Sequence, residues 1–361
     1  MNVVIEKKAT REGFGEGLLD AARENNKIYA ITADLAGSVG MTKFSEEFPT
    51  RFVDVGVAEQ NLVTVCAGLA LGGKIPFAAA FAAFSPGRNW EQIRTTICYN
   101  DQNVKIVGSH AGLGVGEDGA THQMLEDVAL MRVLPNMDVI VPCDSIQAKK
   151  ATIAIAKTNK PTYLRVFRQK TPILTTEDTE FKIGKIQLFS KGKDVVIIST
   201  GPILANVMDS SKQLEKSKIF CTIINCHTIK PLDEENILKH VSDAKLVVVV
   251  EDHQIAGGLG GAIAELLSKN NPKKMLFLGI NDVFGESGTD VELYKKYKLD
   301  SQGITDSIIS ELFSKNKIKN KIKSEIKIQN KIKIKKNNVN NINKQKINTR
   351  KLLSKNKKRR K

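Results

Sequence analysis

The sequence predicts an α/β protein of two domains with mainly parallel sheets, followed by a disordered basic tail. Short β-branched apolar runs alternate with amphipathic segments, a pattern typical of parallel strands connected by helices. The apolar content of 41% is enough for two ordinary cores without disulfides or metal. The formal charge of +16 comes from the tail: residues 314–361 hold 20 Lys and Arg and one Glu, which leaves a net charge of −3 on residues 1–313.

Strands are expected where β-branched residues form short apolar runs, and helices where apolar residues recur at three- and four-residue spacing. The predicted strands are Ile28–Thr32, Val104–Val107, Asp138–Val141, Val195–Ser199, Ile219–Ile224, Leu246–Glu251 and Met275–Gly279. The predicted helices are Arg11–Glu24, Asn61–Leu71, Asn89–Cys98, Ile146–Lys157, Leu204–Lys216 and Gly261–Lys269.

The order of these elements favours a first domain at 1–169 and a second at 186–313, joined by a polar linker at 170–185 that contains Pro and several Thr. The Lys-, Asn- and Ile-rich residues 314–361 offer no core and carry like charges, so we expect disorder there.

Composition also bears on the compartment. Five cysteines, an odd number without a CxxC pair, indicate reduced core residues. The N-terminus is too charged for a secretory signal. The sequence contains no apolar run of 18 residues, so no membrane-spanning helix is expected. These features predict a cytoplasmic protein without a membrane partner.

The octet DVGVAEQN, residues 54–61, places a carboxylate where a helix begins. Glu59 follows a small-residue turn and has mostly apolar neighbours in the sequence. Two interpretations remain open: a buried acid with a functional role, and a carboxylate that caps the helix N-terminus.

The segment PFAAAFAAF, residues 76–84, sets aromatic rings among alanines. Rings without bulky neighbours suit stacking on a planar heterocycle, and core packing explains them equally well.

Residues 109–123, SHAGLGVGEDGATHQ, place two histidines, two acids and four glycines directly after a strand. Open α/β sheets bind ligands at such strand ends, so His110 and His122 suit proton transfer and hydroxyl recognition. The two histidines have no further His or Cys nearby, so no metal ligand is predicted.

The second domain contains a glycine-rich turn, Gly257–Gly261, that leads into a helix. Its amides suit an anion, and a tight turn for close packing is the alternative. His227, His240 and His253 lie in no catalytic motif, so structural roles are expected.

Six segments resemble the transketolase family in order and at family-like spacing. They are DVGVAEQN, FAAFSPGRNWEQIR, HAGLGVGEDGATHQ, LPNMDVIVPCD, IKPLD and VEDHQIAGGLGGAIAE. From about Arg11 to about Phe313, the chain resembles the C-terminal half of the enzyme, which some prokaryotes encode as two polypeptides. The resemblance implies a pyrimidine-binding domain followed by a transketolase C-terminal domain.

The same resemblance implies thiamine diphosphate as the cofactor, with Mg²⁺ or Ca²⁺. Glu59 matches the glutamate that hydrogen-bonds the ring nitrogen of the aminopyrimidine opposite its amino group. Phe84 matches the ring that stacks on the pyrimidine, and Phe81 packs beside it. Asp34 resembles the acid near the thiazolium.

The implied reaction transfers a two-carbon ketol unit from a ketose phosphate to an aldose phosphate, as in the pentose phosphate pathway. His110 and His122 match the paired histidines that bind substrate hydroxyls and the reacting carbonyl oxygen. Asp118 matches the acid that reads a substrate hydroxyl. Arg168 matches the arginine that grips the acceptor phosphate, with Arg165 as the second candidate.

Two departures from the family bear on the site. Gly87 and Arg88 stand where single-chain transketolases carry an aromatic residue. The diphosphate and metal motif, GDG followed by Asn, is missing. The resemblance therefore implies an N-terminal subunit that holds the diphosphate and the cation, with two copies of each chain.

The sequence disfavours two other thiamine-dependent functions and a nucleic-acid-binding one. Deoxyxylulose-phosphate synthase is disfavoured by GVGED and VFRQ, and the β subunit of 2-oxoacid dehydrogenases by GEDGATHQ. The basic tail suggests nucleic-acid binding, but no aromatic residues or recognition fold accompany it, so no specific nucleic acid is expected.

Overall fold

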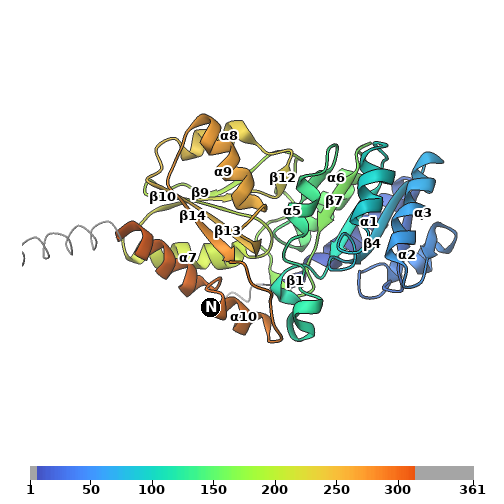
Figure 1. The fold of residues 1–361 in the computed structure, drawn as a ribbon, viewed down its shortest axis with the longest axis horizontal. Helices are drawn as coiled ribbons and strands as arrows, with labels where there is room; N and C mark the ends of the chain where they lie inside the picture. Colours follow the sequence, from blue (N-terminus) through green and yellow to red (C-terminus); the bar gives the residue numbers. More distant parts are fainter. Residues whose placement is uncertain (1–5, 314–361) are drawn as a thin grey trace, which may run out of the picture. The chain divides into compact units, whose positions relative to one another are not determined.

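The computed structural model describes residues 6–313, and two mainly parallel sheets organise them. The predicted disorder of 314–361 lies outside the described residues. Figure 1 shows the strands and the helices that cover them. The fold class predicted from the sequence is confirmed.

The first sheet has seven strands in the order β12-β6-β7-β5-β4-β2-β3. Six of them are parallel, and β12 runs antiparallel to β6. Their bounds are β2 Ile28–Thr32, β3 Phe52–Asp54, β4 Ile75–Phe81, β5 Lys105–Ser109, β6 Asp138–Ile140, β7 Thr162–Arg165 and β12 Thr228–Lys230.

Helices cover both faces of this sheet because its strands alternate their side chains between two cores. Phe77 and Ala79 of β4 pack with residues of helices α1 and α6, whereas Ala78 and Ala80 pack with residues of α3. The helical elements are α1 Thr10–Glu24, α2 Thr42–Glu47, η1 Pro49–Arg51, α3 Glu59–Leu71, α4 Trp90–Gln92, η2 Ile93–Cys98, η3 Leu113–Thr121, α5 Asp127–Arg132 and α6 Ser145–Ala156.

The second sheet has five strands in the order β14-β13-β10-β11-β9, all parallel except β9. The strands are β9 Gln187–Ser190, β10 Val195–Ser199, β11 Cys221–Asn225, β13 Leu246–Gln254 and β14 Met275–Ile280. The helices are α7 Leu204–Lys216, α8 Glu234–Val241, α9 Leu259–Asn270 and α10 Asp290–Lys296, and a further helix begins at Ser301.

Every strand and helix predicted from the sequence is present, with ends that differ by a few residues. Helix 89–98 is the exception in type, because most of it is the π-helix η2. Within the proposed linker, β8 Lys170–Pro172 pairs antiparallel with β1 Lys7–Ala9. The short strand β12, which crosses from the second half of the chain to the first sheet, has no signal in the local sequence.

All five cysteines are unpaired and buried, as predicted for core residues. Burial raises the pKa of the Cys98 and Cys226 thiols to about 12. Among residues 6–313, no helix combines the length and apolarity needed to cross a bilayer.

Candidate active site

The residues singled out in the first domain gather at the carboxyl ends of four neighbouring strands. In the sheet order β5-β4-β2-β3, His110 follows β5, Phe81 ends β4, Asp34 follows β2 and Glu59 follows β3. Parallel strands bring their carboxyl ends to one edge of the sheet, where open α/β folds bind ligands. The topology therefore unites residues that lie up to 76 positions apart, from 34 to 110.

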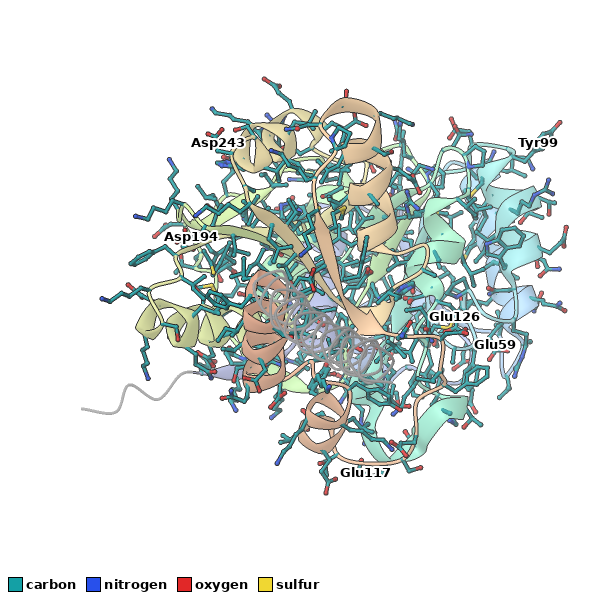
Figure 2. All side chains as sticks on the ribbon, turned by 60° about the vertical axis from the view of Figure 1, so that its left-hand side comes forward. Glu59, Tyr99, Glu117, Glu126, Asp194 and Asp243 are labelled. Atoms are coloured by element: carbon teal, nitrogen blue, oxygen red, sulfur yellow. The ribbon has the colours of Figure 1, made fainter. Side chains whose placement is uncertain are left out.

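Glu59 is the first residue of α3 and only 2% exposed. Figure 2 labels it among the side chains of the first domain. Its carboxylate oxygen Oε2 accepts a hydrogen bond from Arg88 Nη1 at 2.8 Å. Among the described residues, the hydrogen-bond partner of this carboxylate is Arg88. The carboxylate does not accept hydrogen bonds from the backbone amides at the start of α3. The helix-capping interpretation is therefore not supported.

Two aromatic rings and two imidazoles form a cluster beside this acid. Phe81 stacks on His110 with ring centroids 3.8 Å apart, and lies nearly parallel to Phe84 at 5.9 Å. His122 meets the edge of the Phe84 ring at 5.5 Å. Phe77, by contrast, packs in the core against Phe14, so the core-packing interpretation holds for that ring.

His110 is held in one tautomer by its two hydrogen bonds. Arg11 Nη1 can only donate to His110 Nε2, at 3.3 Å, so Nδ1 carries the proton and donates to Ser109 Oγ at 2.9 Å. Burial, with the nearby charges of Arg11 and Arg168, lowers the pKa of His110 to about 3. The imidazole is thus neutral across the physiological range. The sequence reasoning missed Arg11, whose only signal was its place at the start of a helix.

Asp118 and Arg168 meet at the rim of the site. Arg168 Nη1 lies 3.3 Å from Asp118 Oδ2 and donates to the Val115 carbonyl at 2.8 Å. Both side chains are nearly half exposed, so a ligand can reach them. An ion pair at this exposure contributes little to stability.

Arg165 occupies a different environment from Arg168, although both lie in the same short segment. Its side chain is 2% exposed, and its Nε donates to Asp127 Oδ2 at 2.7 Å. Nη2 donates to the carbonyls of Met124 and Asp252. These partners fix Arg165 in the interior, which argues against the substrate contact considered for it. Removing one of these partners would leave a buried, unpaired charge, which is strongly destabilising.

Asp34 is exposed at the end of β2 and has a positive φ of 60°. Its backbone amide donates to Asp54 Oδ1 at 2.9 Å, and the same oxygen accepts from the Gly56 amide. The structure thus ties Asp34 to the turn that leads to Glu59.

The glycine-rich turn of the second domain has an internal anion. Glu251 accepts hydrogen bonds at 2.8 Å from the amides of Leu259 and Gly260, at the start of α9. The amides that suited an external anion are therefore occupied, and the packing interpretation is supported. His253 accepts from the Ala129 amide, and His227 packs on Phe181, as structural residues do.

Arg88 provides a test of whether a flat heterocycle suits this site. Its planar guanidinium bonds the Glu59 carboxylate and also lies 5.2 Å from the centre of the Phe84 ring. One planar group that carries N–H donors therefore meets the acid and the ring together, as an aminopyrimidine would have to. A Cβ on Gly87 would lie 2.1 Å from the Ala83 carbonyl, so no aromatic side chain fits there.

Among residues 6–313, no group of three or more His, Cys, Asp or Glu side chains is arranged to hold a metal ion.

Comparison with known proteins identifies the family. The family model for the transketolase pyrimidine-binding domain matches residues 6–173, and that for the transketolase C-terminal domain matches residues 184–304. A Methanocaldococcus jannaschii protein named as a transketolase C-terminal section is 46% identical over 84% of this chain and 96% of its own length. A 6-deoxy-6-sulfo-D-fructose transketolase subunit from Clostridium sp. is 37% identical over 84% of this chain and 94% of its own.

A solved split-gene transketolase, described as an inactive β4 tetramer, superposes with a TM-score of 0.78 and 41% identity. The match covers 84% of this chain and 97% of that one. With both domains matched in order and two named subunits aligned over nearly their full lengths, the chain belongs to the thiamine-dependent transketolase family and corresponds to a subunit of its split form.

Proposed function

We propose that this chain is the C-terminal subunit of a two-chain transketolase that transfers a two-carbon ketol unit between sugar phosphates. The observation that carries the proposal is the convergence of Glu59, the Phe81 and Phe84 rings, and two histidines at one sheet edge. An N-terminal subunit would complete the site with the diphosphate-binding residues and the divalent cation. We propose two copies of each chain.

Thiamine diphosphate supplies the carbon nucleophile for such a transfer when it is bound. In this proposal, Glu59 bonds a ring nitrogen of the aminopyrimidine and holds the proton there, replacing its contact with Arg88. Phe84 stacks on the heterocycle, and the Phe81 ring packs beside the Phe84 ring. The acid is 2% exposed, so water has little access to its contact with the ligand.

The two histidines are assigned to the substrate. His110 is neutral and its Nε2 faces the guanidinium of Arg11, so this edge of the site can bind and polarise a hydroxyl or carbonyl oxygen. His122 lies against the same rings and is more exposed, so it can exchange protons with the substrate. Arg168 and Asp118 at the rim suit an acceptor phosphate and a sugar hydroxyl.

Relatives support ketol transfer and also limit the substrate assignment. The Clostridium subunit is named for a sulfonated sugar, which shares with a sugar phosphate an anionic group at the end of the chain. A guanidinium binds either anion, so Arg168 fits both. We propose xylulose 5-phosphate and ribose 5-phosphate as the first pair to test.

The need for a second subunit is supported by the split-gene structure, since a tetramer of that β chain is described as inactive. The proposal predicts that this chain alone is inactive and that a mixture with its N-terminal partner is active.

The test is ketol transfer from xylulose 5-phosphate to ribose 5-phosphate, with thiamine diphosphate and Mg²⁺, by each chain alone and by the mixture. Activity of the mixture alone supports the proposal. Association without transfer, together with consumption of pyruvate as donor, would replace it with a synthase function.

A further inference from the structure

The loop of residues 112–122, here called the substrate loop, carries Asp118 and ends at His122. The amide of its second residue, Leu113, is held by a carboxylate of the second domain. Leu113 N donates to both oxygens of Asp252, at 3.0 and 3.2 Å. Gly112 has a φ of 75°, and a Cβ there would lie 2.2 Å from Asp252 Oδ2, so the carboxylate lies directly against the loop backbone.

Tyr294 of α10 extends this contact toward the rim of the site. Its hydroxyl donates to Asp252 Oδ2 at 2.9 Å and accepts from Gln169 Nε2, also at 2.9 Å. Gln169 directly follows Arg168 and packs against the loop, since a Cβ on Gly114 would lie 2.1 Å from its amide group. One hydroxyl thus connects the carboxylate that holds the loop to the neighbour of the rim arginine.

The far end of the loop is also fixed by the second domain. Gln123 Nε2 donates to the Glu286 carbonyl at 2.9 Å and to the Gly116 carbonyl at 3.3 Å. Figure 2 shows Glu117 of the loop near the helix α10, in agreement with the contacts between η3 and α10. Residues at or next to both ends of the loop therefore contact residues outside the domain that carries it.

We infer that Asp252 and Tyr294 are positioning residues for the reaction, through which the second domain sets the geometry of the substrate loop. This inference rests on the proposed function of the same site. Sequence reasoning gave this domain only structural roles, because Asp252 and Tyr294 lie 139 and 181 positions after Leu113. Asp252 is 2% exposed, and its two carboxylate oxygens accept from two donors, the Leu113 amide and the Tyr294 hydroxyl.

The first test is the Tyr294→Phe variant, which removes one oxygen and keeps the ring. In the complex with the N-terminal subunit, we expect faster amide deuterium exchange across residues 112–122. We also expect kcat/KM for the phosphorylated acceptor to fall about tenfold, mainly through KM, because a displaced loop would weaken binding of the acceptor in the ground state and the transition state alike. The matched control is Tyr297→Phe, which loses only a hydrogen bond to the Phe284 carbonyl and should change neither quantity.

A second variant, Asp252→Asn, keeps the side-chain shape but leaves one oxygen to accept hydrogen bonds. It should raise exchange in the same loop peptides and raise the same KM. Wild-type exchange and wild-type KM in both variants would overturn the inference, as would a lower melting temperature without a change in KM. If the wild-type complex transfers no ketol unit, the proposed function fails, whereas loop exchange in the two variants still decides whether Asp252 and Tyr294 hold the loop.

Discussion

Two glutamates, one in each domain, lie in similar local settings and have different partners. Glu59 and Glu251 are each 2% exposed, and each lies near the carboxyl end of a parallel strand and the start of a helix. Glu251 accepts from two backbone amides of its own turn. Glu59 accepts from the side chain of Arg88, which is 54% exposed.

The difference separates a structural acid from one that can serve a ligand. Backbone amides are fixed by the fold, so the carboxylate of Glu251 cannot change partner without unwinding the start of α9. An exposed arginine can move at little cost and release Glu59 to another planar donor. The identity of the partner, more than burial, therefore distinguishes the two carboxylates.

The largest expected effect comes from Glu59→Gln. An amide of the same shape cannot hold a proton at the pyrimidine nitrogen, so ketol transfer by the complex should fall about 10³-fold. The melting temperature of the chain should change little, because Arg88 is a solvent-exposed partner. Steady-state rates and a thermal melt measure the two parts, and undiminished turnover would remove Glu59 from its assigned role.

The reverse pattern is expected for Glu251→Gln. Replacing one acceptor oxygen by a donor leaves a backbone amide at the start of α9 unsatisfied, which should lower the free energy of unfolding by about 1–3 kcal/mol. The turnover number per folded complex should stay within about twofold of wild type, a modest change on the scale of catalytic losses. Denaturant unfolding and active-site titration separate these effects. A loss of turnover without a loss of stability would contradict the structural role assigned to Glu251.

Arg168→Lys tests the rim of the first domain. A lysine keeps the charge but loses the planar pair of donors, so the KM of the phosphorylated acceptor should rise about tenfold with kcat less affected. The control is Arg132→Lys, which alters an ion pair to Glu265 in another part of the protein. Equal KM values for the two variants would argue against a phosphate site at Arg168.

His110 and His227 give a comparison of the same kind for imidazoles. Burial lowers the pKa of His110 to about 3 and that of His227 to about 4, from 6.5. The unfolded chain thus binds more protons below pH 6.5, so stability should fall as the pH falls from about 6.5 toward 4. His110→Asn and His227→Asn should both flatten this dependence in urea unfolding at several pH values. Only His110→Asn should also lose ketol transfer.

The smallest effect is expected from deleting residues 314–361. Their net charge of +19 acts over about 8 Å at physiological ionic strength, so turnover and subunit affinity should be unchanged. A deletion series measured at low and physiological salt checks this. A loss of activity at physiological salt would give the tail a role in the enzyme.

Much of the fold follows from local sequence because parallel strands are continuous apolar runs. Val195–Ser199 and Ile28–Thr32 agree with the prediction at both ends. Strand β7 was missed because it contains only two apolar residues, which lie between the polar Thr162 and Arg165. Arg165 is buried because it pairs with Asp127, a residue 38 positions away in the sequence. Strand β12 was missed because its pairing with β6 is tertiary.

The site was accessible to sequence reasoning where motifs carried it and inaccessible where partners came from elsewhere. Phe81, Phe84 and the two histidines were named from the sequence, and the structure brings them together. The contact of Arg11 with His110 joins residues 99 positions apart. No local pattern encodes such a pair, and the same holds for Asp252 and the substrate loop.

The most direct test of the central claim, that Glu59 activates the cofactor, follows the proton on the thiazolium carbon of bound thiamine diphosphate. Its exchange with deuterium can be measured by quenched-flow NMR in the complex, without any sugar substrate. Exchange should be about 10²-fold or more slower in Glu59→Gln than in wild type, and Glu251→Gln should exchange at the wild-type rate. Equal exchange rates in wild type and Glu59→Gln would contradict it.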